Sequence, residues 1–531
     1  MAERMDLLIR GGVVYDGGPS APAEASVGIA GDRIAWIGKD DYGIDADRVV
    51  EAHGLAVAPG FIDVHAHSDF TLLADPRAQG KLSQGVTTEV NGNCGMSAAP
   101  LIGKVIERRE EDLRELGIVS RWHTFREYFR LLEVQGCGIN TANLAGHGNL
   151  RGSVVGYDDK EPSSEEMAEM RRLLSEAVSD GAIGMSTGLI YPPGIYSSTN
   201  ELTELAKVLR QPDLIYTSHM RSEGNRLQEA VDEVIRIGCE TGIRVNISHI
   251  KTAGEANWHK ADEVIRRLHE ARGGGLRLTC DRYPYIASST DLDSILPPWV
   301  FDGGNDEELR RLCDPSALRR IEEEISAQVS RPGYWGKIIV SSIGSEKNRW
   351  MEGKTLEEIS ARLSVSGMEA FFRLIVEERL RVGAIFMSMS EENLRKFLSL
   401  PFCMIGSDSS SRGFDGPTAA GKPHPRTFGT FARLFGRYVR EEGLLSLPEA
   451  IHKSTMLAAE TFGLKKRGCI REGYFADMVI FDPSGVTDRA TFGAPFRQSE
   501  GIHSVFVNGV EAVSEGRTTG RLGGRVLRSG L

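Results

Sequence analysis

The stretch "GFIDVHAH" at residues 60–67 is an apolar run that ends in two histidines, with a single residue between them. A short apolar run of this kind is typical of a buried β-strand. Residues two apart in a strand project to the same side, so both imidazoles can approach one metal ion. Taken alone, the pair favours a metal site only modestly over two histidines that are satisfied by backbone groups.

Seven similar runs follow along the chain, at residues 85–90, 139–146, 182–187, 214–219, 244–249, 276–283 and 402–408. Helix-like segments lie between several of them. Residues 163–181 open with "SSEE", which is typical of a capping box, and they end at a glycine, as does a second segment at 226–242. Eight buried strands with intervening helices predict an α/β fold, a (β/α)8 barrel of the TIM type.

The two ends of the chain have a different residue pattern. Short strands with Gly and Asp at their turns are predicted at residues 7–16, 26–38, 49–60, 476–483 and 503–513. We therefore predict a small β-sandwich domain formed by both termini, residues 1–58 and 461–531, and a barrel over residues 59–460. The gap before the last barrel strand is too long for one helix, which predicts an inserted subdomain at about residues 290–395.

Composition argues against several classes of function. The 531 residues carry a net charge of −11 and no recurrent basic patch, so nucleic acid is not an expected partner. The sequence has neither a run of about 18 apolar residues nor an apolar signal-peptide core, so we expect no membrane span and no signal peptide. Seven scattered cysteines, an odd number, indicate reduced thiols in a cytoplasm rather than a disulfide framework.

Metal-type side chains fall at the ends of the predicted strands. Six do so: His65 and His67 after the first strand, Cys94 in "NGNCGM" (91–96) after the second, then His219, His249 and Asp408. The carboxyl ends of barrel strands open onto one face, where the loops build active sites. Six ligand-type residues from five strands are therefore expected to converge, which predicts a metal centre.

Single residues of this region allow other interpretations. Asp408 could be the N-cap of the following helix, but a general base beside a metal explains it better, because the cation lowers the cost of an ionised carboxylate. Cys94 alone could be a packing residue or a nucleophile. His147, in "AGHGNLR" (145–151), is as well placed to reach a substrate as to serve the core.

Nine motifs carry a further signal: "PGFIDVHAHSD", "GVTTEVNGNCG", "GHGNLR", "GAIGMSTGLIYPPG", "TSHMRSE", "SHIK", "DRYPY", "IGSD" and "HPRTFGTF". Together they resemble the N-acyl-D-amino-acid deacylases, or D-aminoacylases, of the amidohydrolase superfamily. The resemblance runs from the N-terminal strands to "GCIREGYFADMVIFDP" and so covers nearly the whole chain. Its most specific part is "NGNCG", whereas "HAH" alone would indicate only the superfamily.

The resemblance implies a zinc enzyme with one tight metal site. The tight zinc ligands of the family map onto Cys94, His219 and His249, and a second, weaker position maps onto the paired histidines and Asp408. Many relatives in the superfamily bridge two metals with a carboxylated Lys. This chain has no Lys in the mapped places, and the Cys94 thiolate, a soft donor that suits zinc, would fill part of that role.

The reaction implied is hydrolysis of the amide bond of a small-molecule substrate, an N-acyl-D-amino acid, to a carboxylate and a free D-amino acid. Zinc polarises the carbonyl and lowers the pKa of bound water towards about 7, while Asp408 takes up the proton and delivers it to the departing amine. Family similarity also implies substrate contacts at Lys251, Tyr191, Tyr283 and Ser289. Residues 288–300 contain no Arg for a D-glutamate side chain, so we expect neutral, apolar D-amino acids.

Two alternatives stay open. The same fold could hydrolyse a cyclic amide or imide, or a D-configured dipeptide. The alternative from another class is a metal-binding or scaffold protein without catalysis, and the presence of all six site residues opposes it.

Overall fold

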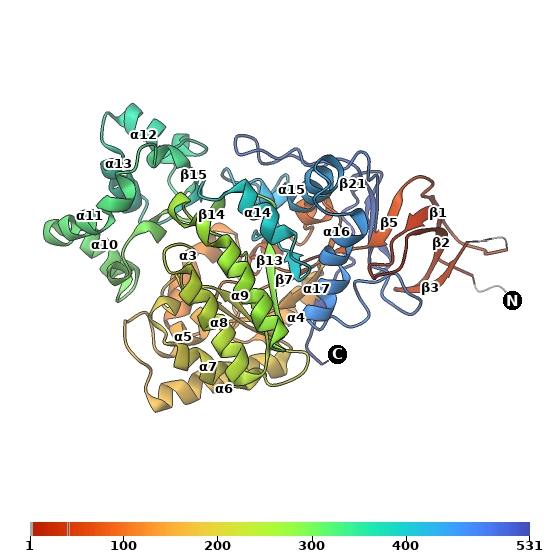
Figure 1. Cartoon of the computed structure of the whole chain (residues 1–531), viewed down its shortest axis with the longest axis horizontal. Coiled ribbons are helices and arrows are strands. Elements are labelled where there is room, and N and C mark those ends of the chain that lie inside the picture. The colour runs from red at the N-terminus through yellow and green to blue at the C-terminus, as the bar shows by residue number, and fades with distance from the viewer. Residues whose placement is uncertain (1–3, 40, 42, 531) are drawn as a thin grey trace.

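Parallel strands form the centre of the molecule. A computed structural model describes residues 4–39, 41 and 43–530 (Figure 1). Each of the eight central segments predicted as strands contains one, and the third contains two. The strands are β6 (Phe61–Asp63), β7 (Val86–Asn91), β8 (Asn140–Asn143), β9 (Ala145–Gly146), β10 (Gly184–Gly188), β11 (Ile215–His219), β12 (Arg244–Ile247), β13 (Leu278–Arg282) and β17 (Cys403–Ile405). They pair in parallel in two sheets. One has the order β6-β7-β8, with the C-terminal strand β22 (Val526–Leu527) paired beside β8, and the other has the order β9-β10-β11-β12-β13-β17.

Backbone hydrogen bonds join the edges of these two sheets. At one edge, Ile183 N donates to Asn143 O at 2.9 Å, which places the start of β10 beside β8. At the other, Val64 N donates to Ile405 O at 3.4 Å, and Asp408 N donates to His65 O at 2.7 Å. Strand β17 therefore lies beside β6 although about 340 residues of chain separate them, and the loops that follow both strands meet.

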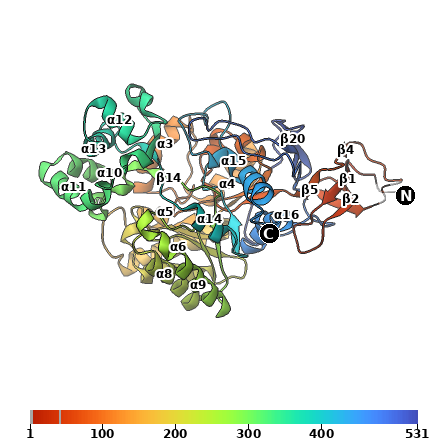
Figure 2. The same cartoon turned by 45° about the horizontal axis from the view of Figure 1, so that its top comes forward.

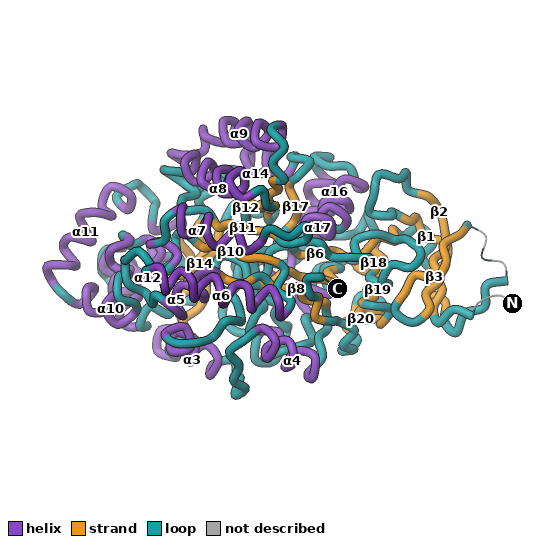
Figure 3. The backbone as a smooth tube through the Cα atoms, turned by 90° about the horizontal axis from the view of Figure 1, so that it is seen from below, coloured by secondary structure: helices purple, strands orange, loops and turns teal. Residues whose placement is uncertain are grey.

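Helices lie outside the central strands, as Figure 3 shows for the row β10, β11 and β12. They are α4 (Phe125–Gln135), α5 (His147–Val154), α6 (Ser164–Asp180), α7 (Thr199–Ala206), α8 (Leu227–Thr241), α9 (Ala261–Gly273), α14 (Glu391–Leu398), α15 (Arg426–Arg433), α16 (Leu447–Ser454) and α17 (Met456–Thr461). The capping box predicted at "SSEE" is confirmed, because the Ser163 side chain accepts from Glu166 N, and α6 ends at Gly181 with φ 119°. In the described part of the chain, no helix has the length and apolarity that a membrane crossing needs.

Strands from both ends of the chain share one nine-stranded sheet, at the end of the molecule where the N-terminus lies (Figure 1). Its members are β1 (Leu7–Val14), β2 (Ala23–Ala30), β3 (Arg33–Gly38), β4 (Val49–Glu51), β5 (Ala56–Pro59), β18 (Met478–Phe481), β19 (Ile502–Val507), β20 (Val510–Ser514) and β21 (Arg517–Thr518). Residues 503–513, predicted as one strand, form the hairpin β19–β20. Its turn is Asn508-Gly509, with φ of 50° and 79°, a pair that suits a tight hairpin turn.

A separate unit lies between β13 and β17, at the far end from the terminal sheet (Figure 2). It contains β14 (Ser288–Asp291), α10 (Asn305–Cys313), α11 (Pro315–Val329), β15 (Ile338–Ile343), α12 (Leu356–Leu363), α13 (Gly367–Glu377) and β16 (Val382–Phe386). Its strands form an antiparallel sheet in the order β14-β16-β15. The unit has a hydrophobic cluster of its own, which includes Leu292, Ile325, Phe371 and Ala384.

Candidate metal centre

The loop after β7 places a cysteine by means of its glycines. Gly92 has φ 75°, and a Cβ there would lie 2.1 Å from Leu144 O. Gly95 has φ 74°, and a Cβ there would lie 2.7 Å from Gly188 N. Only glycine tolerates both the left-handed conformation and the close backbone approach at these positions. The turn they allow holds Cys94 between the loops that follow β8 and β10, with its side chain buried.

Three of the predicted metal-site residues have left-handed backbone conformations. The φ angle is 53° at Cys94, 36° at His249 and 51° at Asp408. Residues with a Cβ rarely adopt such angles, and they persist where the surrounding structure imposes them, most often at functional sites. Each of the three follows the end of a parallel strand, so the strain coincides with the face of the sheet on which the six residues were expected to converge.

The six predicted ligands come together in two groups that share the thiol. The ligand atoms of Cys94, His219 and His249 lie within 4.8 Å of one another, as do those of His65, His67, Cys94 and Asp408. The Cys94 Sγ is 3.2 Å from His65 Nε2 and 3.4 Å from His249 Nε2. The Asp408 Oδ1 is 3.1 Å from His67 Nε2 and 3.6 Å from His65 Nε2.

The chemistry of these donors fits zinc. Both ring nitrogens of the buried His219 lack a hydrogen-bond partner among the described residues, although its ring lies 4.4 Å from that of His249. The His219 ring faces a thiol and a second imidazole but forms no hydrogen bond with either. A cation shared by these three side chains explains this arrangement. One thiolate and two imidazoles are a soft donor set that suits zinc and leaves a position open for water or substrate.

The charges around the site favour the ionised forms of its two acids. Burial raises the pKa of the Cys94 thiol, but the charges of His65 and His249 outweigh it and hold this pKa well below its ordinary value. Burial likewise raises the pKa of the Asp408 carboxyl, but Arg426 and His249 hold it well below its usual range. A thiolate and a carboxylate are the forms that bind a metal or accept a proton.

Sequence reasoning missed two carboxylates that face the predicted ligands, the buried Asp281 and the partly buried Glu223. Asp281, at the end of β13, accepts a hydrogen bond from His249 N at 2.9 Å, and its Oδ1 lies 3.3 Å from His65 Nδ1. The Glu223 Oε1 lies 2.9 Å from His249 Nδ1. A carboxylate on the second ring nitrogen of a ligand fixes the tautomer and orientation of the imidazole. Both acids stand in motifs of the sequence, "DRYPY" and "TSHMRSE", but nothing in one sequence tells which histidine they meet.

Arg426, at the start of α15, is the third residue that was missed. Its Nη1 lies 2.9 Å from Asp408 Oδ2, and both side chains are nearly buried. Because Oδ2 is held by the guanidinium, Oδ1 is left to face His67 and His65. The signal in the sequence was the arginine of "HPRTFGTF".

A cavity of about 1190 Å³ opens over the metal-type residues and reaches into the inserted unit. Three of the predicted substrate contacts line it: Tyr191, Lys251 and Ser289. The Tyr191 hydroxyl is 2.9 Å from Thr290 Oγ1, and its ring packs edge-on against His219 at 5.1 Å. The Lys251 ammonium forms an ion pair with Glu223 and lies 2.7 Å from His249 Nδ1.

Two other predicted contacts lie elsewhere. Among the described residues, neither Tyr283 nor His147 lines the cavity. Tyr283 is buried beneath the guanidinium of Arg426, 4.6 Å from its ring centroid. His147 as a residue that reaches the substrate is contradicted: it begins α5 fully buried, with its Nε2 2.8 Å from a carboxylate oxygen of Glu201, which also pairs with Arg151 at 2.7 Å. This buried triad explains the histidine as part of the core.

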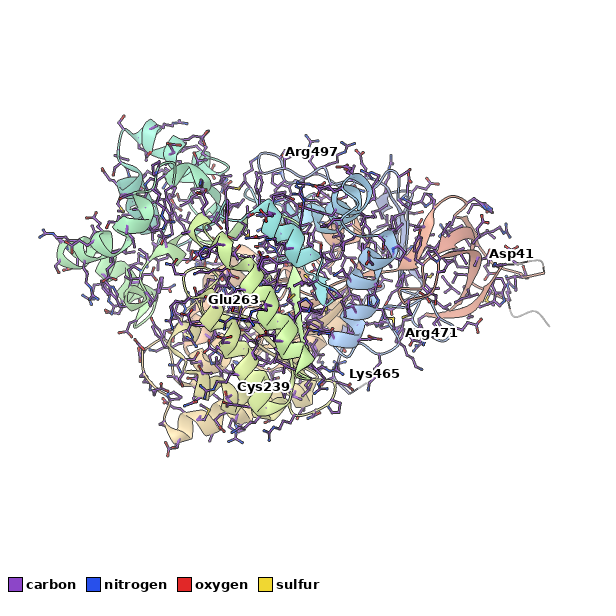
Figure 4. All side chains as sticks on the ribbon, in the orientation of Figure 1. Asp41, Cys239, Glu263, Lys465, Arg471 and Arg497 are labelled. Atoms are coloured by element: carbon purple, nitrogen blue, oxygen red, sulfur yellow. The ribbon has the colours of Figure 1, made fainter. Side chains whose placement is uncertain are left out.

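The cysteines are unpaired throughout the described part of the chain. Five of the seven are buried. Among them, only Cys94 belongs to the two groups of ligand-type residues described above. Cys239, on α8, is exposed and labelled on the surface in Figure 4. The expectation of reduced thiols therefore agrees with the structure over residues 4–39, 41 and 43–530, where no disulfide forms.

Comparison with known proteins agrees with this geometry. The family model described as "Amidohydrolase family" matches residues 48–212 and 351–513. The chain is 38% identical to an N-acyl-D-glutamate deacylase and 37% identical to a D-aminoacylase, both of Alcaligenes xylosoxydans xylosoxydans, over 99% of this chain and 97% and 98% of those proteins. The crystal structure of an N-acyl-D-glutamate deacylase from Bordetella bronchiseptica, complexed with zinc and a phosphonate inhibitor, superposes with a TM-score of 0.83 at 34% identity. The superposition covers 99% of this chain and 100% of the Bordetella bronchiseptica chain.

Proposed function

The chain belongs to the amidohydrolase family, and on that premise we propose that it is a zinc-dependent hydrolase that cleaves the N-acyl amide bond of N-acyl-D-amino acids. The observation that carries the proposal is the pair of donor groups, joined through Cys94, that opens into one cavity. The names of the similar proteins, deacylases that act on N-acylated D-amino acids, supply the substrate class.

We propose that Cys94, His219 and His249 hold the zinc tightly, with His65, His67 and Asp408 at a second, weaker position. Bound zinc supplies a Lewis acid that polarises the amide carbonyl and acidifies water. Asp408 stands beside the donor group as an ionised carboxylate, so it accepts the proton of the attacking water and later delivers it to the amine that leaves. Arg426 keeps this carboxylate oriented through its other oxygen.

We propose a three-part architecture around this site. The parallel strands close into the (β/α)8 barrel, supported by the hydrogen bonds from β6 to β17 and from β8 to β10. Residues 1–58 and 461–531 form one small β-domain, supported by their shared sheet, although its layering as a sandwich stays a prediction. Residues of about 290–395 form an inserted subdomain, supported by their separate hydrophobic cluster.

An assay with three substrates tests the function. We expect the zinc-loaded chain to hydrolyse N-acetyl-D-leucine at least about 100-fold faster, in kcat/KM, than its L-isomer, because exchanging the substituents at the α-carbon misplaces the reacting amide. A cyclic imide serves as the third substrate. Activity on the imide alone would sink the deacylase proposal in favour of the cyclic amidohydrolase, and activity on none of the three would favour the non-catalytic alternative.

We propose neutral, apolar side chains for the D-amino acid. Ile295, Phe386 and Met387 of the inserted unit line the cavity. Cationic side chains line it as well, but several already face carboxylates: Arg109 with Asp112 at 3.0 Å, Arg221 with Glu233 at 3.0 Å, Lys337 with Glu255 at 2.5 Å and Arg426 with Asp408 at 2.9 Å. A neutral side chain leaves these pairs intact.

A side-chain panel checks this preference. Among N-acetyl-D-leucine, -methionine, -phenylalanine, -glutamate and -aspartate, we expect the three neutral substrates to have kcat/KM values at least about tenfold above the acidic ones, the ratio that 1.4 kcal/mol gives. A preference for D-glutamate would contradict the proposal and would direct attention to Arg108 and Arg109, which line the cavity from α3 (Lys104–Glu115).

Lys251 is proposed to meet the substrate α-carboxylate. Its ammonium is buried with Glu223 as its partner, and a substrate carboxylate can share it because an ammonium has three donors. For Lys251→Met we expect kcat/KM for N-acetyl-D-leucine to fall about 10- to 100-fold, mainly through KM, since a charge-assisted hydrogen bond contributes about 1.5–3 kcal/mol. An unchanged KM in steady-state kinetics would remove Lys251 from the substrate contacts.

A further inference from the structure

A second buried lysine lies behind the metal-type residues, and the reaction described above does not use it. Lys81 belongs to the short helix α2 (Gln79–Leu82) and is 1% exposed. Buried lysines are rare unless paired, and this one pairs with Asp63, the last residue of β6, with its Nζ 2.5 Å from Asp63 Oδ2. Asp63 is itself fully buried, so neither charge is screened by solvent.

The ammonium also contacts the loop that carries Asp408. Lys81 Nζ donates to Ser407 Oγ at 2.8 Å and to Ser409 O at 3.0 Å. These residues are the two neighbours of Asp408, whose own backbone is left-handed at φ 51°. The carboxylate of Asp63 holds the same loop, because it accepts from Ser407 N at 2.7 Å and from Ser407 Oγ at 2.6 Å.

The same pair reaches the two histidines of "HAH". Asp63 Oδ1 accepts from His65 N at 3.2 Å, and Ser409 O, which Lys81 contacts, accepts from His67 N at 3.2 Å. One ammonium–carboxylate pair is thus hydrogen-bonded to the backbone on both sides of Asp408, directly to the backbone of His65 and, through Ser409 O, to that of His67. The other donor group depends on different partners, since His249 is held by Asp281 and Glu223.

We infer that Lys81 and Asp63 are positioning residues for one side of the metal centre: they set the geometry of His65, His67 and Asp408, and with it the second metal position and the proton acceptor, without holding the tight zinc. The inference rests on the proposed function for the role of Asp408, but its metal-binding part depends only on the donor geometry.

Paired substitutions test this inference. Lys81→Met leaves Asp63 charged and buried without its cationic partner, so the double variant Lys81→Met/Asp63→Asn, which removes both charges of this pair, accompanies it. Zn²⁺ titration by calorimetry and steady-state kinetics on N-acetyl-D-leucine are the readouts. For the double variant, we expect the dissociation constant of the first zinc to stay within about twofold of the wild-type value. We expect that of the second zinc to rise at least about tenfold. We expect kcat to fall about 10- to 100-fold with KM within about twofold, the range found for residues that support ligands.

Lys453→Met is the matched control. Lys453, on α16, is another buried lysine, but it contacts the backbone oxygens of Leu400 and Cys403, at the opposite end of β17 from Asp408. We expect it to lower the thermal unfolding temperature while kcat and the second zinc stay as in the wild type.

Three results would overturn the inference: wild-type kcat and second-zinc affinity in the double variant, equal effects in Lys453→Met, or equal loss of both zinc ions. If the wild type binds a single zinc, the comparison of kcat and KM decides. If the wild type hydrolyses no N-acyl-D-amino acid but the double variant still loses the second zinc selectively, the proposed function fails and the positioning role stands.

Discussion

Replacing Cys94 by alanine is expected to remove the tightly bound zinc and nearly all hydrolytic activity. The thiol is the one donor that belongs to both ligand groups, so its loss leaves two histidines on one side and takes the shared atom from the other. Even changes to residues that merely support a ligand lower metal affinity about 10- to 100-fold, and the loss of a thiolate ligand should exceed that range. The measurement is zinc per chain by elemental analysis after dialysis, together with kcat/KM for N-acetyl-D-leucine.

Cys280→Ala is the control for this prediction. Cys280 is also fully buried, at the centre of β13, but it faces Cys403 of the neighbouring strand and not the ligand groups. We expect this variant to keep about one zinc and wild-type kinetics. If Cys94→Ala kept both the zinc and the activity, the interpretation of "NGNCGM" as a metal loop would fail.

Asp408→Asn is expected to keep the tight zinc and lose most of the catalytic rate. The amide preserves the shape of the side chain but cannot accept a proton from water, so we expect kcat to fall about 10²- to 10⁴-fold, the usual contribution of a general base. Zinc per chain should stay near one, since the tight set lies on the other side of the thiol. Asp408→Ala should give the same loss of rate.

A second aspartate–arginine pair provides the control for Asp408. Asp488 Oδ2 lies 3.3 Å from Arg433 Nη1, away from the ligand-type residues, and its side chain is similarly buried. Asp488→Asn should cost some stability without a change in kcat. Equal hydrolysis by wild type and Asp408→Asn would refute Asp408 as the base.

Much of the fold could be predicted because segments that become buried have a recognisable local sequence. A strand covered on both faces needs a continuous apolar run, and all eight runs contain strands in the structure. The strand predictions were less precise at the termini. Residues 26–38 were predicted as one strand but form the end of β2 and all of β3. The turn at Gly31-Asp32 divides this segment, and apolar residues on both sides of a tight turn look continuous in one dimension.

The convergence of the six ligand-type residues could also be predicted, whereas the side chains that support them could not. The six share one position, the end of a parallel strand, which can be read from the sequence. Glu223, Arg426 and Asp281 act through pairs whose partners lie far along the chain, and Lys81 meets Asp63 and Ser407 only after β6 and β17 have come together. His147 shows the reverse error: it stands at a strand end, but its ring turns to Glu201 because α5 begins at that residue.

The most direct test of the central claim is a zinc titration of the metal-stripped wild-type chain, followed by its activity on N-acetyl-D-leucine. We predict no activity without zinc and a linear rise that ends at about one equivalent per chain, because the group of Cys94, His219 and His249 fills first. Activity in the stripped chain, or a rise that begins only after the first equivalent is bound, would contradict the account.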